Sequence, residues 1–339
     1  MKNEHMSSSS DDTPKVSVIV PVYNGGKAFH QCLDSITKAQ PKPYELIVVA
    51  DGDTDGSREI ARRVGAQVIE RSTPGGPAQA RNLGAQRATG DILFFIDADV
   101  TIPVDAVQQV QTAFRYQPQM AALIGSYDDT PLESHFLSQY RNLLHHYTHQ
   151  AGREEAFTFW GACGAIRREV FLELGGFDQK YEKPSIEDIE LGYRLVERGH
   201  TIRLIKELQI KHLKRWDAVS MLKTDFFQRA LPWTDLILRS GQIPNDLNLQ
   251  RSSRLSVVCA YGLIASLATA ILRPSMLALS AICAILLVWL NAALYRFFII
   301  KRGVWFTARV LPWHWLYFLY SGLAFGLGIL RFTLEKHRE

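Results

Sequence analysis

The chain has 339 residues, enough for one sizeable domain and a smaller appended part. Its net charge of +4 is small for this length and mixed in sign along the first two thirds, which excludes a strongly basic nucleic-acid-binding protein. The four cysteines lie far apart and match neither a disulfide framework nor a zinc-knuckle spacing, so we expect a reducing, cytoplasmic environment.

The first 14 residues are polar and rich in Ser and Asp, with no apolar signal region. We therefore expect residues 1–14 to be a disordered tail and the part that follows not to be exported. From Val16 onwards, apolar strand-like runs alternate with amphipathic stretches, which is typical of an α/β domain with a mainly parallel sheet.

Two strands are expected at 16–20 and 46–50, each followed by a loop and a helix. The loop after the first strand contains Pro21 and Tyr23. The loop after the second is acidic and holds three carboxylates and a candidate helix cap, namely Asp51, Asp53, Asp55 and Ser57. Such a loop is either a turn with a capped helix or part of a binding site, and both interpretations stay open at this point.

A glycine turn at 74–77 opens a helix that carries Arg81 in its early turns. Because helix starts favour anions, Arg81 is a candidate anion ligand. The turn matches neither the phosphate-binding loop nor the dinucleotide fingerprint, so an ordinary surface arginine is the alternative.

The next run, 92–96, is continuously apolar, as expected of a parallel strand covered on both faces, and it ends at Asp97 and Asp99. Ligands bind beyond the carboxyl ends of such strands, and the two-residue period of a strand sends both side chains to one side. Two carboxylates placed in this way can face one divalent cation that carries a diphosphate. The alternative is a turn with two solvated carboxylates.

Four histidines lie on or beside the helix expected at 132–147: His135, His145, His146 and His149. No Cys or clear carboxylate partner accompanies them, so we interpret the cluster as solvated surface or as a wall of an acceptor site rather than as a zinc site. The segment 157–166 places small residues among aromatic ones. It suits either a floor where the backbone approaches a ligand closely or a tightly packed strand.

A further helix is expected at 186–196, with Gly199 at its end. Ser185 and Asp188 form the S-x-x-D pattern of a capping box, which stabilises a helix start and has no catalytic role. A carboxylate at a helix start can also act as a general base, so both roles stay open for Asp188.

The last third of the chain is the most apolar. Residues 226–250 are amphipathic, as an interfacial membrane element is, and three apolar runs follow at 255–272, 276–295 and 313–330. The first run is about 27 Å long as a helix, close to the thickness of a bilayer core. We therefore expect a membrane domain at 251–339 with about three transmembrane helices.

Six motifs, in this order and spacing, resemble the family-2 inverting glycosyltransferases of the GT-A fold, over residues 16–216. They are the strand and loop at 16–24, the acidic loop at 51–57, Ala80–Gly84, Asp97–Asp99, Gly175–Asp178 and the pair Glu187–Asp188. The resemblance implies a GT-A catalytic domain at 15–225 with a Rossmann-like, mainly parallel sheet. The amphipathic element at 226–250 would then link this domain to the membrane.

The resemblance also implies which residues form the site. The donor site would be lined by Pro21, Tyr23, Asp51, Arg81, Asp97 and Asp99. Asp97 and Asp99 would hold Mg²⁺ or Mn²⁺ with the diphosphate, and Asp188 would be the catalytic base. One carboxylate cannot both support the leaving group and take the acceptor's proton, so two sites share these tasks. With the base opposite the leaving group, the displacement inverts the anomeric carbon.

The chain departs from the family pattern in three places. Ala50 stands where many relatives have Asp, and Asp53 stands where they often have Ser, so the nucleotide base is not indicated and the donor is either UDP- or GDP-linked. Processive synthases carry Gln-x-x-Arg-Trp, whereas this chain has His212 three residues before Arg215 and Trp216. We therefore expect a single, non-processive transfer, with His212 as a candidate third metal ligand.

The sequence thus predicts an integral membrane hexosyltransferase of cell-envelope or glycolipid biosynthesis, in a bacterial inner membrane. The cations that flank the apolar runs place the catalytic domain on the cytoplasmic face by the positive-inside rule. The amphipathic element would press the site against the membrane, so we expect a lipid-linked acceptor hydroxyl or phosphate, with a glycan as the alternative. Two other readings of the whole chain are an inactive nucleotide-sugar-binding scaffold and a processive polysaccharide synthase.

Overall fold

The computed structural model describes residues 13–242 and 249–336. Nearly all of the predicted tail at 1–14 therefore lies outside the described residues, as do residues 243–248 of the predicted interfacial linker.

The described part of the chain contains a nine-stranded sheet. Its strands are β1 (Val16–Val22), β2 (Glu45–Asp51), β3 (Gln67–Arg71), β4 (Ile92–Ile96), β5 (Val100–Thr101), β6 (Met120–Tyr127), β7 (Glu155–Ala156), β8 (Cys163–Arg167) and β9 (Thr201–His212). Their order across the sheet is β3-β2-β1-β4-β8-β6-β9-β5, and β7 also pairs with β9. The predicted runs 16–20, 46–50 and 92–96 correspond to β1, β2 and β4.

The sheet is mixed in direction. Strands β3, β2, β1 and β4 pair in parallel, as do β6 and β9. Strand β8 runs antiparallel between β4 and β6, and both β5 and β7 run antiparallel to β9. The chain winds outward from β1 to β3 and then returns to β4 on the other side of β1, so the carboxyl ends of β1 and β4 form a switch point of the kind where ligands bind.

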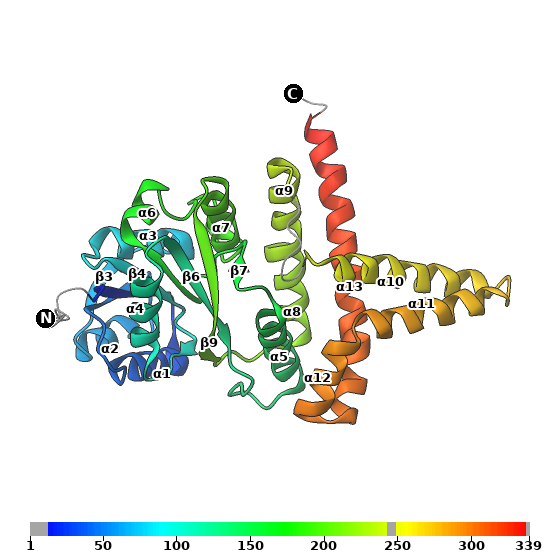
Figure 1. The fold of residues 1–339 in the computed structure, drawn as a ribbon, viewed down its shortest axis with the longest axis horizontal. Coiled ribbons are helices and arrows are strands. Elements are labelled where there is room, and N and C mark those ends of the chain that lie inside the picture. The colour runs from blue at the N-terminus through cyan, green and yellow to red at the C-terminus, as the bar shows by residue number, and fades with distance from the viewer. Residues whose placement is uncertain (1–12, 243–248, 337–339) are drawn as a thin grey trace, which may run out of the picture.

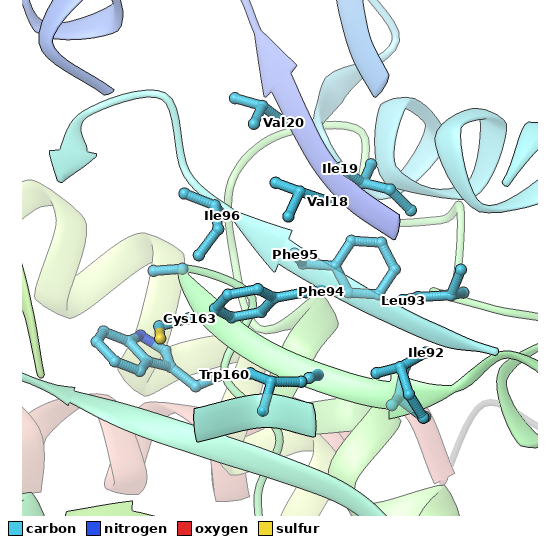
Figure 2. Close-up of a cluster of buried hydrophobic side chains, with 14 of the residues drawn as sticks. Val18, Ile19, Val20, Ile92, Leu93, Phe94, Phe95, Ile96, Trp160 and Cys163 are labelled. Atoms are coloured by element: carbon cyan, nitrogen blue, oxygen red, sulfur yellow. The ribbon is translucent and has the colours of Figure 1, made fainter. Parts of the chain in front are cut away.

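Seven helices of the described residues accompany the sheet: α1 (Gly26–Thr37), α2 (Ser57–Arg63), α3 (Gly76–Arg87), α4 (Ala106–Tyr116), α5 (Phe136–Ala151), α6 (Arg168–Glu173) and α7 (Glu187–Glu197). All five side chains of β4 are fully buried. This confirms the prediction, made from the unbroken apolar run, of a strand covered on both faces. Figure 2 shows β4 side chains beside those of β1, with Trp160 and Cys163 at one end of the cluster.

The rest of the described chain is helical. It comprises α8 (Ala218–Lys223), the π-helical segment η2 (Thr224–Ala230), α9 (Leu231–Ser240), α10 (Arg251–Ala270), α11 (Met276–Leu290), α12 (Ala292–Arg302) and α13 (Val304–Lys336). In Figure 1, α9 and α13 run side by side next to the sheet domain. The hairpin of α10 and α11 projects away from that domain, across the direction of α13.

Two of the described helices, α10 and α13, are long and apolar enough to cross a membrane. The second apolar run, predicted as one helix at 276–295, is instead α11 followed by α12, with a bend of 65° at Asn291. Counting that bent pair as one span brings the total to three. The third run, 313–330, is the middle of α13, which starts before Pro312.

Candidate active site

The loop between β4 and β5 carries Asp97 and Asp99 at the switch point of the sheet. Strand β5 pairs with β9 so that Val100 lies opposite His212, and the Leu213 N–H donates to the Asp99 carbonyl oxygen at 2.9 Å. This pairing brings the end of β9 beside the loop, where His212 Nε2 is 3.7 Å from Asp99 Oδ2. The structure thus places the three predicted metal ligands in one neighbourhood.

These residues fit a divalent cation only in part. Among residues 13–242 and 249–336, no group of three or more His, Cys, Asp and Glu side chains is arranged to hold a metal ion. The side chains of Asp97 and Asp99 are 33% and 38% exposed, so both are accessible to a ligand. Carboxylate oxygens suit Mg²⁺ or Mn²⁺, and phosphate oxygens commonly complete the shell of such an ion. The donor set therefore fits a cation that arrives with a diphosphate.

Arg81 is buried, whereas a surface arginine was the alternative from its sequence. Its Nη2 donates to Asp97 Oδ1 at 2.7 Å, and its Nη1 donates to Glu187 Oε1 at 2.9 Å. Gly161 lies directly against the guanidinium, because a Cβ there would come within 2.9 Å of Arg81 Cζ. One side chain therefore joins the loop after β4 to the first turn of α7.

Asp188 lies in that first turn of α7, but it does not form the capping box that its sequence allowed. The cap residue is Ile186, and no side chain caps the helix. The Ser185 hydroxyl donates instead to the Gln228 carbonyl oxygen at 2.9 Å. Asp188 Oδ2 accepts a hydrogen bond from the Gly161 N–H at 2.9 Å. The predicted capping box is therefore not formed, although Asp188 Oδ1 also accepts a hydrogen bond from the first-turn N–H of Ile189 at 2.8 Å. The Asp188 carboxylate faces the segment predicted as a floor.

The surroundings of Asp188 favour its protonated form. Partial burial raises the pKa of Asp188 from 3.8 to about 6, and the negative charge of Glu187 acts in the same direction. The Gly161 hydrogen bond and the Arg81 charge act against this rise in pKa. A carboxyl group that titrates near the working pH is suited to take and release a proton.

The carboxylates of the acidic loop, in contrast, are bonded within the protein. Asp51 was predicted to line the donor site. It accepts hydrogen bonds from the N–H groups of Gly75 at 3.0 Å and Gly76 at 2.8 Å, and it pairs with Arg71 at 3.0 Å. Asp51 therefore holds the glycine turn that starts α3.

The remaining acidic-loop residues join neighbouring segments. Asp53 pairs with Arg58 at 3.2 Å. Ser57 does not cap α2, because the cap residue is Gly56. The Ser57 hydroxyl instead donates to Asp55 Oδ1 at 2.6 Å. The helix-cap part of the turn interpretation is thus wrong, and donor binding by this loop stays a prediction.

The loop after β1 is tied to the acidic loop. The Gly26 N–H donates to Asp55 at 2.9 Å, and the Thr54 N–H donates to Asn24 Oδ1 at 2.7 Å. Pro21 is partly buried in β1, and Tyr23 is 59% exposed, so the Tyr23 ring is accessible to a flat ligand.

Three groups near Asp188 had a weaker signal in the sequence. Glu187 was noted only as half of a motif, but it is the buried partner of Arg81. Arg229 was noted only as one cation of the amphipathic stretch, and it shares a small cavity with Asp188. His145 lines the same cavity, while His146 is buried and its Nδ1 lies 2.7 Å from the Tyr127 carbonyl oxygen. His145 and His149 thus form a wall beside Asp188, His146 is buried without lining the cavity, and His135 is exposed.

The fold is of the GT-A class. The structure is similar to the mannosyltransferase PcManGT of Pyrobaculum calidifontis, solved with GDP-Man and Mn²⁺, with a TM-score of 0.60 over 92% of this chain and 87% of that one. The sequence identity between the two is 19%. This likeness confirms the predicted fold.

Residues 17–175 match the sequence profile of Glycosyl transferase family 2, so the chain carries a domain of that family. It is 36% identical to glycosyltransferase GlyG of Streptococcus pneumoniae serotype 4 over 105 residues, which are 28% of this chain and 35% of GlyG. It is 27% identical over 273 residues to validoxylamine A glucosyltransferase of Streptomyces hygroscopicus subsp. limoneus, or 67% of this chain and 59% of that one. The chain spans about one third to three fifths of the length of these relatives.

Proposed function

We propose that the chain moves a hexose from a nucleoside-diphosphate sugar to a membrane-held acceptor, in one non-processive transfer that inverts the anomeric carbon. The observation that carries this proposal is the placement of Asp188. It is a carboxyl group with a pKa of about 6, next to a cavity and joined through Glu187 and Arg81 to the Asp97 loop.

The donor occupies the switch point in this proposal. Tyr23 offers a surface for the nucleotide base, and Asp51 contributes by shaping the glycine turn rather than by direct contact. Asp99, Asp97 and His212 would hold Mg²⁺ or Mn²⁺, and the ion would supply positive charge against the departing diphosphate. The similar structure of PcManGT supports this donor class, since it was solved with GDP-Man and Mn²⁺.

The acceptor reacts on the side of Asp188. Asp188 takes the proton of the acceptor O–H, and the acceptor oxygen forms a bond to the anomeric carbon. The bond from that carbon to the diphosphate oxygen breaks, and its electron pair leaves with the nucleoside diphosphate. An inactive scaffold has no need for a carboxyl group with a raised pKa at this position.

The hairpin of α10 and α11 is proposed to anchor the protein in the membrane. Helix α10 has 20 residues, about 30 Å of helix, which matches a bilayer core. Cations lie in the first turn of α10 at Arg251 and Arg254 and at the end of α12 at Lys301 and Arg302, while the hairpin tip has only Arg273. Lys301 pairs with Asp129 and Arg302 bonds to Gln139, so these cations lie against the catalytic domain, which the positive-inside rule places in the cytoplasm.

Helix α13 then lies along the membrane surface instead of crossing it, because it runs beside α9 and across the hairpin (Figure 1). Reporter fusions after Arg273 and after Glu339 test this arrangement. We expect the first reporter to be outside and the second to be cytoplasmic. If the second reporter is found outside, α13 crosses the membrane, in agreement with the prediction of three spans.

A donor screen tests the activity. Membranes that contain the full chain are given UDP- and GDP-sugars with Mn²⁺ or Mg²⁺, and nucleoside diphosphate release and labelled product are measured. We expect release with one donor class, and we expect it to be lost in Asp188→Asn membranes. No release with any donor contradicts the proposal.

A further inference from the structure

A cavity of about 380 Å³ lies between the catalytic domain and the membrane helices. Its walls come from α5, η2, α9, α10 and α13, and they are mostly apolar, with Leu144, Trp233, Ile237, Val257 and Phe318 among them. The volume is within the range of pockets that hold small organic molecules, about 300–1,000 Å³. An apolar cavity of this size beside an enzyme's candidate base is suited to bind part of a substrate.

The charged groups in this cavity are not all neutralised. Arg141 and Asp225 form a two-pronged ion pair, and the Tyr320 hydroxyl donates to Asp225 at 2.6 Å. Arg229 lines the same cavity, and within residues 13–242 and 249–336 its guanidinium has no hydrogen bond or ion pair. Asp188 acts on Arg229 through its charge without a direct contact. A partly buried cation with no direct ion-pair partner favours an anionic ligand.

A second, smaller cavity of about 50 Å³ adjoins the first, because four residues line both: His145, Thr148, Arg229 and Trp233. Asp188 lines the smaller one. The shared residues include His145, whose Nδ1 is buried and has no hydrogen-bond partner in the described part of the chain. The smaller cavity has room for only a few heavy atoms, which suits a phosphate group better than a sugar ring.

The larger cavity also reaches the membrane-facing surface. Val258 on α10 and Phe325 on α13 line it, yet they are 68% and 40% exposed. Both helices continue beyond the cavity with exposed apolar side chains such as Leu255 and Leu323. An apolar chain that leaves the cavity at this point would enter the bilayer rather than water.

We propose that these two cavities bind a lipid monophosphate as the acceptor, with the phosphate at Arg229 and His145 and the hydrocarbon chain leaving past Val258 and Phe325. This inference rests on the proposed function and names its acceptor. A P–OH proton passes to Asp188, the phosphate oxygen bonds to the anomeric carbon, and the nucleoside diphosphate leaves with the electron pair of the broken bond. The product is a lipid phosphate sugar.

Binding is tested without any donor, on the purified full chain in neutral detergent, with labelled hexadecyl phosphate as the probe. We expect Arg229→Gln to weaken binding by about tenfold or more, the scale of one hydrogen bond to a charged group. Arg239→Gln is the matched control, because Arg239 on the same helical stretch pairs with Asp235 and does not line the cavity. Equal binding by both variants, or equal binding of hexadecanol by the wild type, overturns the phosphate site.

The chain path is tested with bulky substitutions. Val258→Trp narrows the mouth and should weaken binding of hexadecyl phosphate. Ile285→Trp adds the same bulk at an exposed hairpin position that does not line the cavity, and it should bind as the wild type does. Unchanged binding by Val258→Trp contradicts the exit between α10 and α13.

Transfer assays in vesicles then separate the two proposals. We expect labelled sugar on hexadecyl phosphate. Sugar found only on a neutral glycolipid or a soluble oligosaccharide overturns the lipid phosphate acceptor and leaves the transferase function standing. Binding of hexadecyl phosphate with no turnover of any nucleotide sugar supports this site and contradicts the proposed function.

Discussion

Two acidic regions of this protein carry several carboxylates each, and they differ in what those carboxylates bind. In the loop at 51–57, Asp51, Asp53 and Asp55 are each bonded to backbone N–H groups or side chains of the protein. At the start of α7, Glu187 is bonded to Arg81, whereas Asp188 receives hydrogen bonds from the N–H groups of Gly161 and Ile189, has no ion-pair partner within the described residues, and lines a cavity. The number of carboxylates in a loop is therefore a poor guide to catalytic or ligand-binding function. A better guide is how many carboxylate lone pairs are not already used in hydrogen bonds within the protein.

The largest expected effect is on Asp188. Asp188→Asn should lower transfer by about 10²-fold or more, since a general base contributes on that scale, while nucleotide binding stays intact. Transfer rate per folded molecule and nucleotide affinity are the measurements. Asp217→Asn is the matched control, because Asp217 forms a true capping box at the start of α8 and should lose some thermal stability but no transfer. If Asp188→Asn behaves like Asp217→Asn, the two acidic regions do not differ as described.

Next in size is Asp99→Asn, which should weaken Mn²⁺-dependent binding of nucleoside diphosphate by at least about tenfold, through loss of a charged oxygen ligand. Asp97→Asn should also be severe, because it removes a partner of Arg81. Calorimetry with and without Mn²⁺ measures the effect. Asp91→Asn, at the other end of β4, should bind normally. Unchanged affinity in both Asp97 and Asp99 variants removes the metal site from this loop.

Asp51→Asn should act on stability instead of chemistry. It weakens the bonds to Gly75, Gly76 and Arg71, which should lower the free energy of unfolding by about 2 kcal/mol, the scale of hydrogen bonds to a charged group. Denaturant titration measures this, and exposed Asp34→Asn should change little. A loss of nucleotide affinity with full stability means that Asp51 contacts the donor directly.

The smallest expected effect is on pH dependence. Because Asp188 must be ionised to act as a base and its pKa is about 6, transfer should fall by about tenfold between pH 7 and pH 5. The contribution of Asp188 to folding stability changes with pH in the opposite direction. The folded state holds this proton more tightly than the unfolded state, so the contribution is present below pH 3.8 and is lost as the pH rises through 6. A flat rate profile from pH 5 to 7 contradicts Asp188 as the base.

Much of the fold could be predicted because β1, β2 and β4 are buried apolar runs that end in polar loops. The antiparallel insertion of β8 could not be predicted, since its small and aromatic residues fit either a strand or a ligand floor.

In the candidate site, Asp97, Asp99 and Asp188 could be identified from their spacing in the sequence. The unpaired state of Arg229 depends on packing between α5, η2 and α13, which no local pattern encodes.

The pairing of β5 with β9 has a consequence for how this sequence can vary in length. His212 faces Asp99 because Val100 is held opposite it, and a strand alternates its faces with every residue. Deleting a single residue from the middle of β9 would present a neighbour of His212 to the Asp99 loop, whereas deleting two would restore the same face. Natural length changes in this segment should therefore come in even steps or be absorbed in the irregular stretch between Leu204 and Gln209, where β9 already departs from a regular register with β6.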